Sequence, residues 1–296
     1  MRVNKAITRA LSLSRAGNHP AAWRTLFPHR VALSATPSLA AAWVELSVNA
    51  NASFARRQEL LTVIEAWPES PAIVSAAASA LIDAFDGRPP DHRTTPDDPM
   101  HRVASAVEAC LVGVPAQSPQ SSELYHRMGC ALRLSGQSRG AITALRAALA
   151  GAPEEIGWRY DLGLAYKSDA RFAAALRSFE AYAAEKGADD EGLLWNLAIC
   201  ATGAGRGDRA RDFWRAMGMT DVTLGEDRLP KVPDLGRITV RLIGPDDAPI
   251  EVDARPQSPC HGWLDAPIFA SGLWDGAPVR PVQPGQPPCL PLLSIL

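Results

Sequence analysis

The segment Tyr125-His-Arg-Met-Gly-Cys-Ala-Leu132 returns thirty-four positions later as Arg159-Tyr-Asp-Leu-Gly-Leu-Ala-Tyr166. Gly129 and Gly163 correspond within these two stretches, and two further pairs beyond them are separated by the same interval: Ala141 and Ala175, Leu145 and Phe179. Self-similarity at a fixed interval of this length is the sequence signature of a protein built from stacked repeats. The recurrence therefore decides the fold class.

Each copy is typical of two antiparallel helices joined by a short polar turn, at residues 135–138 in the first copy and 168–171 in the second. Glycine inside a helix costs about 1 kcal/mol relative to alanine. Gly129 and Gly163 therefore predict a neighbouring helix backbone that approaches too closely for a Cβ atom. Large apolar side chains on the second helices would fill the space between copies and stabilise the stack by about 1.5–3 kcal/mol each: Leu145, Phe179 and Trp214. Stacking is required because no copy can bury its apolar face alone.

The repeat resembles the tetratricopeptide repeat (TPR), whose pattern of Trp, Leu-Gly, Tyr, Ala, Phe, Ala and Pro extends over about 34 residues. The resemblance is strong over residues 122–189 and good over 190–219, where Leu197-Ala198 stands in place of Leu-Gly. It is degenerate over residues 38–71 and weaker again in about the first thirty residues. The resemblance implies a mostly α fold, a right-handed α-solenoid of TPR-like helix-turn-helix repeats.

Composition divides the chain into four segments. Residues 1–87 are rich in Ala and Leu and predict degenerate helical repeats, whereas residues 88–100 contain four prolines and predict a linker. The TPR-like repeats follow over residues 101–219. Residues 230–296 are rich in proline and predict a small β-rich C-terminal unit.

Two runs of alternating apolar residues, Ile238–Ile243 and Ile250–Arg255, flank a Gly-Pro-Asp-Asp turn in this last segment. This pattern predicts a β-hairpin. The chain ends in an apolar run, Cys289–Leu296. Either this run packs as a last strand, or a longer domain has been cut there.

Charge and targeting signals narrow the functional classes. The chain of 296 residues has 30 Lys and Arg against 32 Asp and Glu, a formal net charge of −2, so nucleic acid is not an expected partner. No apolar run reaches the roughly 20 residues that cross a bilayer, and the N-terminus lacks the core of a signal peptide. Five scattered cysteines without a Cys-x-x-Cys pair predict free thiols. We therefore expect a soluble cytoplasmic protein without a membrane partner.

Two places gather residues that could carry chemistry. Cys260 and His261 could form a nucleophile with its base or two metal ligands, but neighbours on a strand face opposite sides, which favours a structural turn. The linker contains several possible metal ligands whose spacing fits no calcium or zinc pattern: Asp91, His92, Asp97, Asp98 and His101. Phosphate-loop, GxSxG and HExxH motifs are absent. The protein is thus expected to be no enzyme and to hold no metal and no cofactor.

The resemblance implies a binding surface, because first helices of successive TPR units line a concave groove that receives a peptide or a helix of another protein. By position in the repeat, the groove residues would be Glu123, His126, Arg133, Tyr160, Leu164, Lys167, Trp195 and Ile199. Simple packing is an equal alternative for Leu164 and Ile199, whereas the aromatic residues among the eight favour an interface. One TPR subtype grips a terminal carboxylate with Lys, Asn and Arg. The corresponding positions here hold His126, Cys130, Tyr160 and Leu164, so that clamp is not expected.

These observations predict a protein–protein interaction scaffold or adaptor that binds an apolar or mildly acidic segment. Two alternatives remain at this point. The protein could be an accessory or regulatory subunit whose C-terminal β unit binds a second component. It could also be an enzyme that uses Cys260 and His261.

Overall fold

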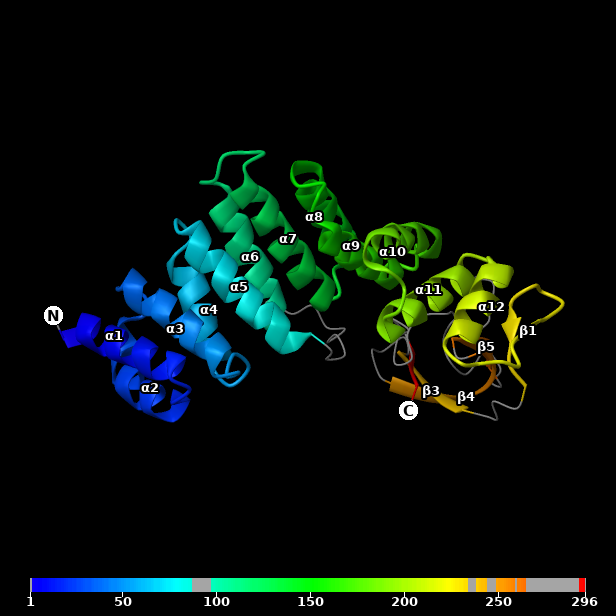
Figure 1. Ribbon diagram of the computed structural model, residues 1–296, viewed down its shortest axis with the longest axis horizontal. Coiled ribbons are helices and arrows are strands. Elements are labelled where there is room, and N and C mark those ends of the chain that lie inside the picture. The colour runs from blue at the N-terminus through cyan, green and yellow to red at the C-terminus, as the bar shows by residue number, and fades with distance from the viewer. Residues whose placement is uncertain are drawn as a thin grey trace. The chain divides into compact units, whose positions relative to one another are not determined.

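The computed structural model describes residues 2–86, 97–233, 238–243, 249–258, 260–264 and 293–295. The chain divides into two compact units, Met1–Trp158 and Arg159–Leu296. The helices and strands of both are labelled in Figure 1.

The first unit consists of helices that pack as neighbouring pairs. These are α1 (Arg2–Arg15), α2 (His19–Leu26), η1 (Phe27–Ala32, a 3₁₀-helix), α3 (Pro37–Asn49), α4 (Arg57–Ala66), α5 (Pro71–Phe85), α6 (Pro99–Leu111), α7 (Pro119–Leu134) and α8 (Ser138–Gly151). Helices α1, α3, α5 and α7 pack against one another in series, and each also contacts the even-numbered helix that follows it. This arrangement confirms the helical repeat fold that the sequence predicts.

Proline and short polar side chains set where these helices begin. Helices α2, α3, α5, α6 and α7 each have proline at the first or second position, where its missing N–H costs no hydrogen bond. Asn18 caps α2 by accepting from the Ala21 N–H at 3.2 Å, and Ser118 caps α7 by accepting from the Ser121 N–H at 3.1 Å. The sequence therefore specifies the starts of these helices locally.

The Pro-rich segment does not divide the chain into separate units. Helix α5 precedes this segment and packs against both α6 and α7, which follow it. Residues 87–96, most of the expected linker, lie outside the described residues. The boundary between the compact units instead falls at residues 158 and 159, within α9 (Ile156–Ser168). Composition could not reveal this boundary, because packing across the proline-rich stretch joins its two sides.

The glycines of the repeat lie in close contact with neighbouring residues, as predicted, but mostly with their side chains. A Cβ atom on Gly129 would lie 2.6 Å from Cγ of Leu145, and one on Gly163 would lie 2.7 Å from Cε1 of Phe179. At the first position a backbone atom is among the three nearest, since the Ala141 carbonyl oxygen would be 3.2 Å away, whereas the three nearest atoms at Gly163 all belong to the Phe179 ring. The large apolar residues predicted to fill the stack are all fully buried: Leu145, Phe179 and Trp214.

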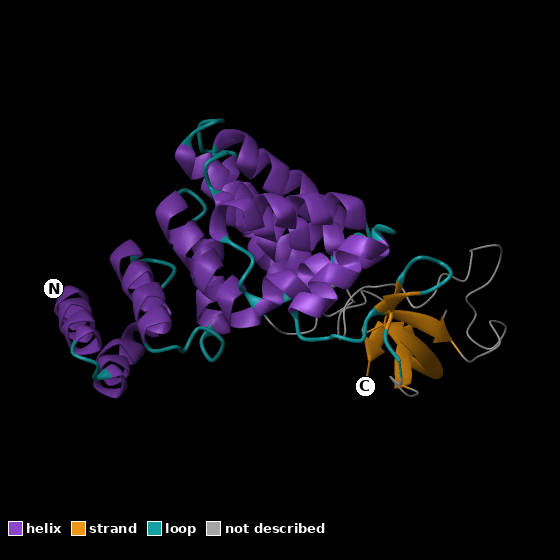
Figure 2. Cartoon of the chain, turned by 45° about the vertical axis from the view of Figure 1, so that its right-hand side comes forward, coloured by secondary structure: helices purple, strands orange, loops and turns teal. Residues whose placement is uncertain are grey.

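The second unit continues with helices and ends in strands (Figure 2). After α9 come α10 (Phe172–Lys186), α11 (Glu191–Gly203), α12 (Gly207–Ala216), β1 (Thr223–Leu224), β2 (Pro230–Lys231), β3 (Ile238–Ile243), β4 (Pro249–Ser258), β5 (His261–Leu264) and β6 (Leu293–Ile295). Strands β3 and β4 pair antiparallel with Val240 opposite Val252, which confirms the predicted hairpin. Strand β6 pairs with β3, so the final apolar run does contribute a strand, in the sheet order β5-β4-β3-β6.

The β elements cover the last helices of this unit. Val222 is fully buried, and its carbonyl oxygen accepts from Nη2 of Arg215 at 3.0 Å. A Cβ atom at Gly207, where α12 begins, would collide with the carbonyl group of Arg228, so the β1–β2 turn lies directly against this helix. The N–H of Val232 donates to the carbonyl oxygen of Gln257 at 2.7 Å and joins β2 to β4. The β elements therefore close the C-terminal end of the helix stack in this unit.

Candidate functional site

A groove of about 380 Å³ lies between helices α5 and α7 of the first unit. It is lined by Pro71, Ala72, Ser75, Ala76, Ser79, Gln120, Glu123, Leu124 and Arg127. The α5 wall consists of proline and small side chains, whereas the α7 wall is mostly polar and charged. Of the predicted groove residues, only Glu123 lines this space.

Glu123 is held in place by both helices. Its Oε1 atom accepts a hydrogen bond of 2.6 Å from Oγ of Ser75, which is itself mostly buried. The guanidinium of Arg127 lies 3.4 Å from the same oxygen, as an i,i+4 pair on α7. About half of the Glu123 side chain, 47%, remains exposed. The carboxylate is thus fixed in orientation and still open to a ligand.

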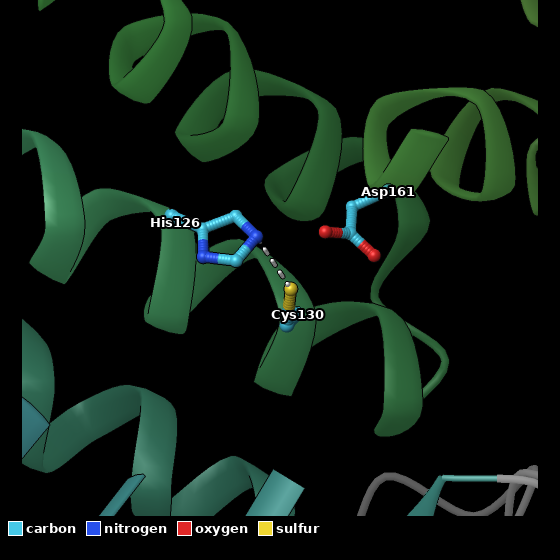
Figure 3. Close-up of side chains that lie close together, drawn as sticks. All are labelled: His126, Cys130 and Asp161. Atoms are coloured by element: carbon cyan, nitrogen blue, oxygen red, sulfur yellow. Dashed lines mark hydrogen bonds between the residues drawn. The ribbon is translucent and has the colours of Figure 1, made fainter. Parts of the chain in front are cut away.

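The other two predicted residues of this unit serve internal contacts. The His126 ring stacks on the Trp158 ring, with centroids 4.7 Å apart and an interplanar angle of 10°. Its Nε2 atom lies 3.4 Å from Sγ of Cys130, one turn along α7 (Figure 3). Arg133 reaches Asp86 at 3.4 Å, and its side chain is 15% exposed. His126 is only 7% exposed, so little of it is available to a partner.

In the second unit a chain of hydrogen bonds joins two predicted residues through a third that the prediction missed. Nζ of Lys167 donates to Oδ1 of Asn196 at 2.5 Å, and Nδ2 of Asn196 donates to the Tyr160 hydroxyl at 2.9 Å. Lys167 and Asn196 are buried, and burial raises the pKa of the Tyr160 phenol. The signal for Asn196 was a single amide within the apolar run Leu193–Ile199. Such a buried polar group needs a hydrogen-bonding partner.

The apolar groove residues predicted in this unit pack inward. Ile199 has no exposed surface, which fits the packing alternative for this residue and not a place on a free wall. It belongs to the buried cluster that also contains Val222 and Cys260, so part of the chain's own C-terminal segment packs into that cluster. Leu164 and Trp195 are partly buried against the same cluster, and the Trp195 ring meets Trp214 edge-on at 5.2 Å. A partner-binding role for Tyr160, Leu164, Lys167 and Trp195 stays a prediction.

The Cys260 thiol is enclosed rather than presented to a substrate. Its residue is 4% exposed, and its N–H donates to Oγ of Ser258 at 3.3 Å in the turn between β4 and β5. Nearby Cys200 is fully buried, and this burial raises its pKa from 9.0 to about 12, against the opposing effect of Lys167. A nucleophilic cysteine needs an accessible thiol, which Cys260 does not offer. The geometry therefore favours the structural turn over the catalytic alternative.

No protein-family model matches this sequence, and no curated protein matches it either. Among solved structures, a crystal structure of MamA is similar with a TM-score of 0.44 and 17% identity, over 58% of this chain and 91% of that one. A structure of MamA residues 41 to the end, from Desulfovibrio magneticus RS-1, is similar with a TM-score of 0.45 and 16% identity, over 61% of this chain and 90% of that one. No binding partner is carried over to this chain from similarities of this size.

Proposed function

We propose that the protein is a non-enzymatic interaction scaffold that holds a short segment of another polypeptide in the groove between α5 and α7. The observation that carries this proposal is the groove itself, with its fixed and half-exposed carboxylate at Glu123. A volume of about 380 Å³ lies within the range of about 300–1,000 Å³ found for ligand sites. The groove can therefore take a few residues of a peptide.

The lining suits an extended peptide backbone. Ala72 and Ala76 leave room for a chain to lie close to α5, because their side chains end at Cβ. The Ser79 hydroxyl and the Gln120 amide also line the groove and form no hydrogen bond with other residues that the structure describes. Both can pair with the N–H and C=O groups of a bound chain. Glu123 would then select for a basic group or a further donor at one position of the peptide, in place of the mildly acidic segment that the sequence predicts.

The first prediction tests the groove by filling it. Ala76 is exposed and lines the groove, so Ala76→Trp should occupy the space without disturbing the core. We expect peptides selected from a random library against the full chain to bind this variant at least about tenfold more weakly, since 1.4 kcal/mol of lost contact corresponds to tenfold. Fluorescence anisotropy of labelled peptides measures the difference.

Ala109→Trp is the matched control, because Ala109 is an exposed alanine on α6 and does not line the groove. It should bind the selected peptides as the unaltered protein does. Equal affinities for both variants would contradict the proposed site. Failure to select any peptide would contradict the proposed function.

A further inference from the structure

Positive charge is concentrated at the start of the chain. Residues 1–57 contain eight Lys and Arg against a single acidic residue, Glu45, which gives this part a net charge of +7. The whole chain has a net charge of −2, so residues 58–296 carry −9. An asymmetry of this size within one chain indicates an interaction with an anionic surface. The near-neutral net charge of the whole chain conceals this asymmetry.

The basic side chains lie on the outer surface of the first helices. Lys5 and Arg9 are exposed on α1, where they line a depression together with Asn4, Thr8 and Ser12. Arg24 on α2 and Arg30 on η1 are exposed as well. None of these four basic residues forms an ion pair with a residue in the described part of the chain, so their charge is not neutralised locally.

Helices α1, α2 and η1 pack on one another and hold this charge at one end of the first unit (Figure 1). Arg15 does pair with Glu45, at 3.4 Å, but both side chains are largely exposed and such a pair is weak. We call the four exposed cations Lys5, Arg9, Arg24 and Arg30 the basic end. They lie on three consecutive short helices, α1, α2 and η1.

The apolar residues of α1, α2 and η1 show how deeply this region could insert into an apolar medium. Ala10, Ala22 and Leu26 are fully buried among the helices, so the apolar sides of α1 and α2 are already occupied. Val31 is the exception, because it is 84% exposed and follows directly after Arg30. One projecting apolar side chain beside a cation suits shallow contact with a lipid interface.

We infer that the basic end binds the surface of an anionic lipid bilayer, as a peripheral contact. None of the helices in the described ranges is long and apolar enough to cross a membrane, so this contact would rest on charge and on Val31. A planar anionic surface can meet the end of the first unit that is formed by α1, α2 and η1, where the positive charge of this unit is concentrated. Each exposed Lys or Arg near such a surface strengthens binding by about fivefold.

A nucleic acid fits the same surface less well. Single-stranded bases are held by stacking on aromatic faces, and the Trp23 and Phe27 rings already face the guanidinium of Arg56 at 4.9 and 5.0 Å. Phosphate contacts would also gain nothing from the exposed Val31 side chain. The bilayer is therefore the partner that accounts for both the cations and the apolar residue.

The second prediction is tested with the full chain and lipid vesicles. The protein should sediment with vesicles of phosphatidylcholine that contain about one-third phosphatidylglycerol, and not with phosphatidylcholine alone, because only the first are anionic. The triple variant Lys5→Gln, Arg9→Gln, Arg24→Gln should lower the partition coefficient by about a hundredfold. Binding should also fall as salt rises from about 0.1 to about 1 M, where the Debye length shrinks from about 10 to about 3 Å.

The matched control removes three exposed cations elsewhere, as Arg146→Gln, Arg177→Gln, Lys186→Gln. It should retain binding, and a thermal melt of each variant shows that folding is unchanged. Val31→Ser should weaken binding a few-fold without altering its salt dependence. Equal sedimentation with neutral and anionic vesicles, or equal losses in the two triple variants, would overturn the inference. Tighter binding to a short duplex DNA than to the anionic vesicles would overturn the choice of partner.

Discussion

The Phe179 ring occupies the place that a Cβ atom on Gly163 would need, with three ring atoms within 2.7–2.9 Å of that position. Phe179 is fully buried, and the Tyr160 ring meets it edge-on at 5.3 Å. The ring therefore has little freedom to withdraw, because close-packed interiors transmit a displacement to their neighbours. One missing methyl group thus allows α9 and α10 to pack closely.

The third prediction concerns this contact. Gly163→Ala should lower the free energy of unfolding by about 1–3 kcal/mol, because the overpacked ring outweighs the gain of about 1 kcal/mol in helix propensity. Gly157→Ala is the control on the same helix, since a Cβ atom there meets nothing within 4 Å. It should leave stability unchanged or raise it slightly. Urea unfolding measures both, and a loss of equal size in the control would contradict the explanation.

Single residues also show how far the sequence can predict a site. Gly129 and Gly163 indicated close contacts because glycine inside a helix is costly, but whether a ring or a backbone fills the space depends on side-chain conformation. The hydrogen bonds of Asn196 depend on residues of α9 that lie 29 and 36 positions earlier. Only the presence of a polar residue in an apolar helix was visible in advance. Its partners required the folded chain.

At the scale of elements, α11 is enclosed more fully than its place in the repeat suggests. Its residues Leu197–Thr202 are all buried. Helices α10 and α12 cover part of it, and Val222 and Cys260 belong to the same cluster. The helical periodicity predicted the first two contacts because they are local. Cys260 reaches the cluster from far along the chain, so the sequence did not show which of the two alternatives for Ile199, packing or a place on a free wall, the fold would favour.

The fourth prediction tests this enclosure. Val222→Asp should lower the stability of the second unit by several kcal/mol, because it places a carboxylate in an apolar cluster. Thr223→Asp introduces the same charge at the next, exposed position and should have little effect. Hydrogen exchange should accelerate in α11 and α12 of the first variant only. Unchanged protection there would show that the β elements do not hold these helices.

For the whole molecule, the pH dependence of stability reports on the buried core of the second unit. The pKa of Cys200 is raised from 9.0 to about 12, chiefly by burial. Above pH 9.0 the unfolded chain releases this proton while the folded chain keeps it. The unfolded state is thereby favoured, and stability is lost as the pH rises from 9.0 towards about 12.

The fifth prediction follows from this sign. The unfolding free energy of the unaltered protein should fall more steeply between pH 9 and pH 12 than that of Cys200→Ala, which lacks the thiol. Lysines and tyrosines titrate in both proteins, so the difference between the two curves isolates Cys200. Parallel curves would mean that this thiol ionises in the folded state as easily as in the unfolded state.

Totals taken over the whole chain concealed what its parts reveal. A net charge of −2 argued against any polyanionic partner, although the first 57 residues alone carry +7. Helices α5, α6 and α7 likewise pack together, a contact that composition alone does not reveal. Repeats are visible from sequence because neighbours along the chain become neighbours in space. Charge distribution and long-range packing are not visible in averages.

The seating of the β1–β2 turn on α12 also limits how such a molecule could be enlarged. An additional helix pair grafted after α12 would need the surface that the Arg228 carbonyl and Val222 now occupy. New helix pairs would have to be inserted among the earlier helices instead, where each pair already presents a packing surface to the next pair. The carboxyl-terminal strands thus terminate the helix array. Duplication of a helix pair can lengthen the array only at a position that precedes these strands in the chain.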